Sequence, residues 1–347
     1  MSDKSITVYD IAERAGVSPA TVSRVITGKA RVREDKAERV REAMEALAYR
    51  PNLMARNLQT RESKTLGVIL PDISNPFFSE FYLELEREAL TRGYTMFLCN
   101  TMNNSFQELG DVESLYLRSL VERRVDGIVF MGGRINTTKP DKAHAQEMID
   151  IADQVPLVMV NGRMPGMDGY LVKTDERAGI IAMIEYQIAQ GHKELALLGG
   201  FSGMVPADLK IRAFKDVIKK HDLPLRNQWI IPSGFSVQAG EQAIATILKL
   251  GRRPSAVVCV NDYVAIGVLR GALEAGLAIP DDLSISGFDN ISMTAHTYPA
   301  LSTVSHDFPT LATKTVDTLL ALKAGQAPAK KTELPMQLVI RESIRSV

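Results

Sequence analysis

The chain is 347 residues long, 45% of it is apolar, and its 41 basic residues balance its 41 acidic ones. That length suits two or three domains that each bury a core, which argues against a disordered chain. No stretch approaches the roughly 18 to 20 apolar residues of a membrane span, and the N-terminus lacks the basic start and apolar run of a secretory signal, so we expect a cytoplasmic protein without membrane contact.

The charge is unevenly distributed along the chain. Residues 1–64 carry 13 Lys and Arg against 9 Asp and Glu, whereas the remainder carries 28 against 32. A basic head on an acidic body fits a nucleic-acid contact confined to the N-terminus, although a chance fluctuation in surface charge would look the same. Cys99 and Cys259 each lie in an apolar, strand-like run, which predicts reduced packing residues.

Three short helices are predicted in the head. Residues 8–15 place apolar side chains on one helix face, and Gly16 can take the left-handed conformation that ends a helix. Ser18 is a strong N-cap and Pro19 is favoured at a first helical position, so a second helix begins at Pro19. A third is predicted over residues 34–48. The first two, joined by a glycine turn, form a predicted helix-turn-helix, although a helical bundle without a DNA role has the same spacing.

The exposed face of the second helix is small and polar. Arg24 has the fork geometry for a guanine edge or a phosphate, and Thr21 and Ser23 suit phosphate oxygens. These side chains favour a DNA-reading surface.

A hinge is predicted after Pro51. Asn52 can cap a helix over residues 53–58, but one or two turns are too few to be stable alone in water. We therefore expect this segment to be ordered only when another surface holds it. The alternative is a plain linker with a core-facing leucine.

The body is predicted to be an α/β structure. Apolar runs about 30 residues apart alternate with amphipathic helical stretches, beginning near residues 66, 94, 125, 155, 195, 230, 256 and 283. Alternating β and α units predict parallel sheets covered by helices on both faces, in two lobes divided near Thr174. One further helix (residues 308–324) and a final strand (residues 334–341) are predicted in the tail.

A ligand pocket is predicted where these strands end, because ligands of open parallel sheets bind at the carboxyl ends of the strands. The polar residues that follow the runs are Asp72, Asn100, Asn161, Asn261, Asp262, Asp289 and Asn290, with aromatic faces nearby at Phe77, Phe78 and Phe235. Acceptors for paired hydroxyl groups beside flat rings suit a sugar or a nucleoside. The alternative is that each Asn or Asp caps a helix or turn.

An enzyme is not expected. The sequence contains no nucleophile elbow, phosphate-binding Walker loop, metal-ligand cluster or paired catalytic carboxylates, and the five histidines are scattered. We therefore assign no catalytic residue, metal or cofactor. A periplasmic sugar-binding protein would share the body but needs a signal peptide and has no use for the head.

The head and body motifs together resemble the lac repressor/gal repressor (LacI/GalR) family. The head motifs are YDIAERAGVSPATVSRVITGKARV and YRPNLMARNL, and the body follows in family order with LGVILPDISNPFF, DGIVFMGG, VNDYVAIG and SISGFDN. The resemblance covers nearly the whole chain. It implies a homodimeric transcription regulator, a repressor, that binds a near-palindromic double-stranded DNA operator and a small-molecule effector between the lobes. The tail has no leucine heptad, so we expect dimers rather than tetramers.

The resemblance implies DNA contacts in the head and hinge. Residues matching Pro19 and Ala20 begin the recognition helix, the one matching Arg24 contacts bases, and the one matching Leu58 wedges into the minor groove, as apolar wedges do. The full set expected to contact DNA is Tyr9, Ser18, Pro19, Ala20, Thr21, Ser23, Arg24, Asn52, Ala55 and Leu58. One departure is Arg33, which stands where the family has a Ser or Thr cap for the third helix, at a cost of about 1 kcal/mol.

In the body, the resemblance assigns effector contacts to Asp289 and Asn261, and aromatic contacts to Phe78 and Phe235. The full predicted effector set is Asp72, Phe77, Phe78, Asn161, Lys210, Phe235, Asn261 and Asp289. The main departure is Lys210, since many members place a forked arginine there, whereas lysine offers a point charge on a flexible stem. The resemblance also implies three chain crossings between the lobes.

The expected domains are a head, a hinge and a body of two lobes. Their boundaries are 1–51, 52–64 and 65–347, with lobe 1 at about 65–173 plus 305–332 and lobe 2 at about 174–304 plus 333–347.

Overall fold

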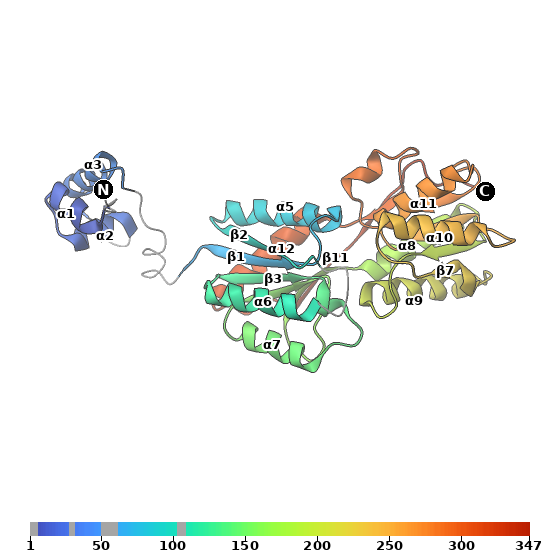
Figure 1. The fold of residues 1–347 in the computed structure, drawn as a ribbon, viewed down its shortest axis with the longest axis horizontal. Coiled ribbons are helices and arrows are strands. Elements are labelled where there is room, and N and C mark those ends of the chain that lie inside the picture. The colour runs from blue at the N-terminus through green and yellow to red at the C-terminus, as the bar shows by residue number, and fades with distance from the viewer. Residues whose placement is uncertain (1–5, 28–31, 50–61, 103–108) are drawn as a thin grey trace. The chain divides into compact units, whose positions relative to one another are not determined.

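The computed structural model describes residues 6–27, 32–49, 62–102 and 109–347. The chain divides into two compact units, Met1–Ser63 and Lys64–Val347, which we call the head and the body (Figure 1). Among the helices in the described ranges, none has the length and apolar character to cross a membrane.

The head contains three helices, α1 (Val8–Ala15), α2 (Pro19–Thr27) and α3 (Glu34–Ala46). A reciprocal cap starts α1: the Thr7 backbone N–H donates to Asp10 Oδ2 (2.7 Å), and the Asp10 N–H donates to Thr7 Oγ1 (3.4 Å). Gly16 ends α1 with φ 59°, the left-handed value that glycine adopts without strain. The helices bury one small core, formed by Ile11, Ala12, Ala15, Val22, Val40 and Ala43. The predicted third helix is two residues too long, because Ala48 has a positive φ of 47°.

Lobe 1 of the body is built on a six-stranded sheet with the order β11-β5-β4-β3-β1-β2, in which all neighbours pair in parallel. Its strands are β1 (Thr65–Leu70), β2 (Thr95–Asn100), β3 (Gly127–Met131), β4 (Leu157–Val160), β5 (Tyr170–Thr174) and β11 (Lys331–Leu334). Side chains alternate between the two faces, so Leu66 and Val68 pack beneath α5 (Pro76–Thr91) and α12 (Phe308–Lys323). Ile69 and Ile128 pack instead beneath α6 (Leu109–Glu122) and α7 (Lys142–Ala152).

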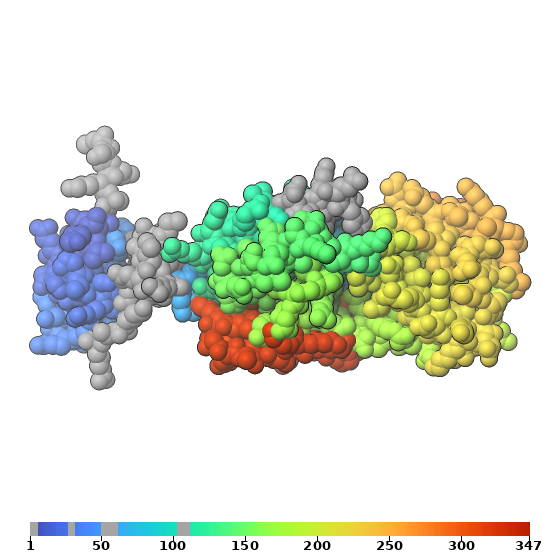
Figure 2. All heavy atoms as spheres, turned by 90° about the horizontal axis from the view of Figure 1, so that it is seen from below, coloured from blue at the N-terminus to red at the C-terminus, as the bar shows by residue number. Residues whose placement is uncertain are grey.

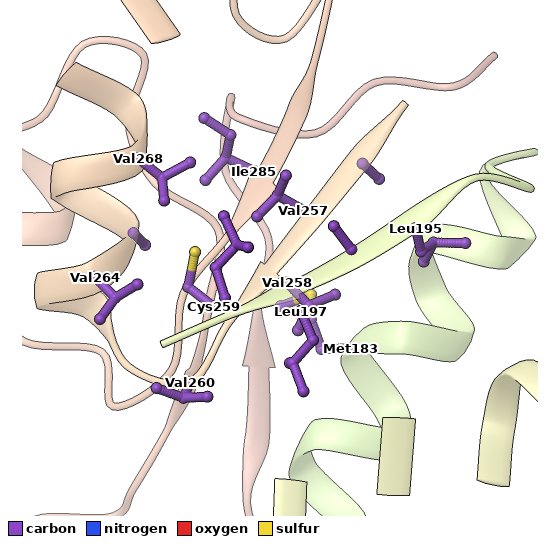
Figure 3. Close-up of a cluster of buried hydrophobic side chains, with 14 of the residues drawn as sticks. Met183, Leu195, Leu197, Val257, Val258, Cys259, Val260, Val264, Val268 and Ile285 are labelled. Carbon is purple, nitrogen blue, oxygen red and sulfur yellow. The ribbon is translucent and has the colours of Figure 1, made fainter. Parts of the chain in front are cut away.

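Lobe 2 is built on a four-stranded parallel sheet with the order β7-β6-β8-β9. The strands are β6 (Leu195–Leu198), β7 (Ile230–Ile231), β8 (Ala256–Cys259) and β9 (Ser284–Ser286), and the helices are α8 (Glu176–Ala189), α9 (Val205–Lys220), α10 (Val237–Leu248) and α11 (Asp262–Glu274). Figure 3 shows Met183 of α8 beside Val258, and Val264 of α11 on the other face of the same strand. Cys259 is buried in this core and carries a free thiol, as does Cys99 in β2.

The chain crosses between the lobes three times. It crosses after Thr174 of β5, again between β10 (Thr303–Ser305) and α12, and finally between β11 and β12 (Gln337–Val339), which pairs antiparallel with β10. The last crossing therefore follows Leu334, two residues after the expected boundary.

Several features of the body, β10 among them, differ from the sequence-based expectation. The single final strand predicted over residues 334–341 is wrong: β11 and β12 are separate strands of different sheets. Pro335 lies between them, and proline cannot donate to a sheet. β5 was not predicted, because its residues are mostly half-buried and include Lys173, which breaks the apolar pattern.

Candidate functional site

The exposed surface of α2 is organised by Ser18. Its hydroxyl oxygen accepts from the Thr21 backbone N–H (3.2 Å) and lies 2.9 Å from Thr21 Oγ1, so both side chains are engaged in the cap. Pro19, Ala20 and Arg24 are exposed along the same helix, whereas Val22 is fully buried. Small exposed side chains beside one arginine give α2 the shape and chemistry to enter a major groove.

The other head residues expected to contact DNA fall into two groups. Tyr9 projects from α1 with 74% of its surface exposed, and Ser23 is half-buried. Asn52, Ala55 and Leu58 lie outside the described residues. The missing cap of α3 is observed: Arg33 makes no side-chain capping bond and instead pairs with Asp35 (3.1 Å).

The body contains a cavity of about 600 Å³ lined by residues of both lobes. All eight residues predicted for the effector site line it: Asp72, Phe77, Phe78, Asn161, Lys210, Phe235, Asn261 and Asp289. They converge because the strands of each lobe are parallel and end on the side that faces the other lobe. The volume is in the range of small-molecule sites.

Two of these residues have unusual backbones. Asn161 has φ 48° and Asp289 has φ 116°, values that glycine adopts more readily than other residues. Asp289 is held there by its backbone N–H, which donates to the Val304 carbonyl (2.8 Å). Strained residues of this kind persist only where the surrounding structure fixes them, and they concentrate at binding sites.

A chain of hydrogen bonds connects these two residues behind the cavity wall. The Thr174 backbone N–H donates to Asn161 Oδ1 (2.8 Å), Thr174 Oγ1 lies 2.9 Å from His306 Nδ1, and His306 Nε2 lies 3.2 Å from Asp289 Oδ1. The Thr174 hydroxyl also donates to Asn161 Oδ1 (3.3 Å), so a charged His306 ring donates to Thr174 Oγ1 through Nδ1 and to the Asp289 carboxylate through Nε2. The His306 ring stacks on Phe308, with centroids 5.6 Å apart and planes 3° from parallel.

Asp289 is a largely buried ionisable group in the cavity wall. Burial raises its pKa above the ordinary range, while the hydrogen bond from His306 and the charges of His306 and Lys210 act in the opposite direction. The pKa of Asp262, behind it, is also raised well above its ordinary value, by burial and by the nearby Asp289 carboxylate.

Lys210 does not present an unpaired charge to the cavity. Its ammonium lies 3.0 Å from Glu176 Oε2 and 3.9 Å from the centre of the Phe288 ring. The two charged side chains are only 6% and 14% exposed. Burial alone would raise the pKa of Glu176, but Lys210 and His306 oppose this and the net pKa is lowered.

Aromatic side chains form opposing walls of the cavity. Phe77 and Phe78 of α5 meet edge to face, with centroids 4.9 Å apart, on the lobe 1 side. Phe201 and Phe235 do the same at 5.6 Å on the lobe 2 side. Tyr263 links the lobes, because its hydroxyl donates to the Ser74 carbonyl (3.1 Å). A ligand between these walls would contact flat apolar faces from both lobes.

Some strand-end residues have structural roles. Asn100 accepts from the Ile73 N–H, Asn290 bonds Ser305 and Arg341, and Asp262 accepts from Thr303 and from the Ile291 N–H. Asn261 lines the cavity but also caps α11 through the Val264 N–H and donates to the Phe235 carbonyl. The capping alternative therefore holds for part of the strand-end set.

Several cavity residues were not predicted from the sequence: Ser74, Asn75, Asn136, Glu176, Phe201, Ser233, Ser236 and Tyr263. Glu176 begins the helix after β5, so recognising that strand would have identified it. Asn136 lies in the short helical turn Gly133–Asn136 after β3, which the paired glycines could have indicated. Phe201 and Ser233 lie in loops without a periodic pattern.

Comparison with known proteins defines the class. The description "Bacterial regulatory proteins, lacI family" matches residues 7–52, and "Periplasmic binding protein-like domain" matches residues 184–344. The chain is 31% identical to the HTH-type transcriptional repressor PurR of Vibrio vulnificus, covering 98% of this chain and 99% of that protein. It is 32% identical to catabolite control protein A of Priestia megaterium, covering 86% and 87% of the two chains.

The solved structures agree. A lac repressor dimer bound to operator and the anti-inducer ONPF matches with a TM-score of 0.86 and 26% identity, over 99% of this chain and 100% of that one. The fold is thus that of a helix-turn-helix transcription regulator with a periplasmic-binding-protein-like body. The chain belongs to the lacI family of bacterial regulatory proteins.

Proposed function

We propose that this regulator binds a near-palindromic operator as a homodimer and represses transcription, with its DNA affinity set by a small effector in the cavity of the body. The observation that carries this proposal is the cavity itself, since its walls come from both lobes. A ligand that contacts both lobes binds one arrangement of the lobes better than another. The difference in ligand-binding free energy between the two arrangements sets the largest change in DNA affinity that the ligand can cause.

We propose residue roles that the geometry described above supports. Arg24, Pro19 and Ala20 are proposed to read bases from α2, and Ser18, Thr21, Ser23 and Tyr9 to hold the phosphate backbone. The proposed effector contacts are the eight predicted cavity residues, with Asp289 as the main acceptor for ligand hydroxyl groups.

A second copy of the chain is the proposed occupant of an apolar surface on lobe 1. β2 is an edge strand, and its Phe97 and Leu98 are 45% and 37% exposed. Leu83 and Leu90 of α5, two turns apart on one helix face, are 55% and 58% exposed. An apolar sheet edge beside an apolar helix face invites pairing with another chain, and a two-fold dimer would bring two heads to one palindrome.

Two further assignments rest on this function. A DNA-binding regulator works where the chromosome is, so we place it in the cytoplasm. A regulator needs no catalytic group, and we assign none. Burial raises the pKa of the Cys99 thiol to about 11 and that of Cys259 well above the ordinary value, which disfavours the nucleophilic thiolate in both.

The function is tested by selecting duplexes from random DNA with the full chain and measuring sedimentation with and without the selected site. We expect a near-palindromic site bound by a dimer. Phe97→Glu should yield monomers and weaken binding, whereas Leu225→Glu, at a residue 43% exposed on lobe 2, should not. Failure to enrich any sequence would refute the proposed function, and a stable tetramer or a micromolar monomer would refute the proposed dimer.

A further inference from the structure

The charges around the cavity are unequal. Among the described residues that line it, three are acidic, Asp72, Glu176 and Asp289, and one, Lys210, is basic. No arginine is among them. A phosphate or carboxylate brought into this cavity would meet a net negative wall, where reduced dielectric strengthens the repulsion.

The one basic side chain among these described lining residues is already paired. Lys210 Nζ lies 3.0 Å from Glu176 Oε2 and over the face of Phe288, and 6% of its side chain is exposed. An incoming anion would have to compete with a buried carboxylate for this ammonium. Drawing Lys210 away would leave Glu176 buried without its counter-ion, which is strongly unfavourable.

Helix N-termini, the other common anion sites, also carry acceptors from the chain itself at this cavity. The side chains of Asn75, Asp175, Ser236 and Asn261 each accept one N–H group from the first turn of α5, α8, α10 and α11, at 2.9 to 3.1 Å. The remaining helix, α9, has no side-chain cap, but Pro206 removes one N–H there and Asp208 places a carboxylate in its first turn. Each dipole at the cavity therefore has an acceptor from the chain itself.

The polar atoms that remain for a ligand belong mostly to neutral groups. Asn136 Oδ1, Asn161 Nδ2 and Ser233 Oγ are buried without a hydrogen-bond partner in the structure, and Glu176 Oε2 has only its ion pair with Lys210. All four residues line the cavity. Buried polar atoms in native proteins almost always find partners, and at a cavity wall a ligand hydroxyl or amide group can supply one.

We propose that the cavity takes an uncharged, polyhydroxylated ligand and rejects its phosphorylated or carboxylated form, with the Glu176–Lys210 pair as the element that closes the site to anions. This inference rests on the proposed function only in that the same cavity binds the effector. The neutral atoms bond the hydroxyl groups, the two phenylalanine pairs pack against apolar ring faces, and Glu176 keeps Lys210 from acting as an anion receptor.

The first experiment compares matched ligands on the full chain. Glucose, galactose, ribose, xylose, trehalose and cytidine are each tested beside their phosphate monoesters, by melting temperature and then calorimetry. Any sugar or nucleoside that binds is expected to lose at least about tenfold in affinity when phosphorylated, because of the acidic wall. A phosphate monoester that binds as tightly as its uncharged parent, or more tightly, would overturn the proposal.

The second experiment uses inorganic phosphate as the probe. Glu176→Gln keeps the shape of the side chain but leaves the Lys210 ammonium without its counter-ion. Phosphate should then raise the melting temperature of this variant by several degrees more than that of the wild type. The matched control is Glu185→Gln, on the same helix, whose partner Lys220 lies 2.7 Å away outside the cavity. It corrects for the general stabilisation that phosphate gives by exclusion from protein surfaces.

Two results would overturn the role of the pair. One is a phosphate response in the wild type, above that of an equal ionic strength of chloride, that Lys210→Met abolishes. The other is a Glu176→Gln variant that responds to phosphate no more than Glu185→Gln does. If a phosphate ester binds the cavity and alters operator affinity, this inference fails while the proposed function stands. If an uncharged ligand binds the cavity but leaves operator affinity unchanged, the proposed function fails while this inference stands.

Discussion

Replacing Asp289 with glycine should remove the effector response without harming the DNA-binding state. The substitution suits the backbone, since glycine adopts φ 116° readily whereas alanine would be strained there. It also removes the repulsion between two buried carboxylates, because the Asp289 charge raises the pKa of Asp262. We therefore expect the variant to fold, and its ligand-free operator affinity to stay within a few-fold of the wild type.

The magnitude follows from the bonds that Asp289 can make. His306 lies 3.2 Å from Oδ1, which leaves Oδ2 to accept one or two hydroxyl hydrogens from the ligand. A hydrogen bond to a charged acceptor contributes about 1.5 to 3 kcal/mol, so one or two of them contribute about 1.5 to 6 kcal/mol. At about 1.4 kcal/mol for each factor of ten, the ligand affinity should fall by at least about tenfold, and by about a hundredfold or more where both bonds form.

The assay has two arms on the full chain. Calorimetry measures affinity for whichever sugar or nucleoside raises the wild-type melting temperature, and fluorescence anisotropy measures operator binding with and without it. Asp289→Asn, which keeps one acceptor oxygen and tolerates a positive φ, should lose less affinity than Asp289→Gly. Asp281→Asn, at an exposed position on the same lobe, is the matched control. Ligand affinity within threefold of the wild type in Asp289→Gly would refute the assignment, as would loss of ligand-free operator binding.

Three further predictions concern the head, the hinge and lobe 1. Arg24→Ala should weaken the selected site by about 1 to 3 kcal/mol and leave random DNA little affected, whereas an equal loss on both would mean that Arg24 only holds phosphate. Leu58→Ala should weaken operator binding while ligand binding stays normal, and hydrogen exchange over residues 52–60 should slow only with operator present; strong protection in the free protein would contradict this coupling. Burial raises the pKa of Glu113 to about 7 although Arg134 opposes the shift, so the folded state holds this proton more tightly than the unfolded state, whose value is near 4.5. The resulting stability is present below pH about 4.5 and is lost as pH rises towards 7, by up to about 3 kcal/mol, because each pKa unit corresponds to about 1.4 kcal/mol. Urea unfolding at several pH values should therefore show that Glu113→Gln lacks this slope, and identical slopes in variant and wild type would contradict the assignment.

Local sequence signals predicted the head well. Gly16 ends one helix and Ser18-Pro19 begins the next because backbone geometry and capping act over only a few residues. The convergence of strand-end residues also followed from the sequence, since parallel strands end on one side of a sheet. Asn161 and Asp289 are far apart in the chain, yet a rule about topology brings them to one cavity.

Contacts between side chains from different elements could not be predicted in this way. The sequence predicted that Lys210 faces the effector with a point charge, whereas the structure pairs it with Glu176. This pairing could not be predicted because Glu176 follows β5, a strand that the apolar pattern did not show. His306 was one of five scattered histidines until the fold placed it against Asp289. The sequence indicates which residues reach the end of a strand, and only packing determines which of them are already paired.

The hydrogen-bond chain from Asn161 through Thr174 and His306 to Asp289 also has a mechanical consequence. Thr174 and His306 lie at two of the three chain crossings, and a rotation of one lobe against the other would bend the protein at these crossings. Near an axis, a rotation displaces atoms only slightly, whereas the same rotation moves the far ends of the lobes much further. A ligand that bonded Asn161 and Asp289, as proposed above, would act close to these crossings, where only small atomic displacements separate one lobe angle from another. Distinguishing such small displacements requires rigid side chains. The positive-φ backbones of Asn161 and Asp289, at the two ends of this hydrogen-bond chain, would provide that rigidity.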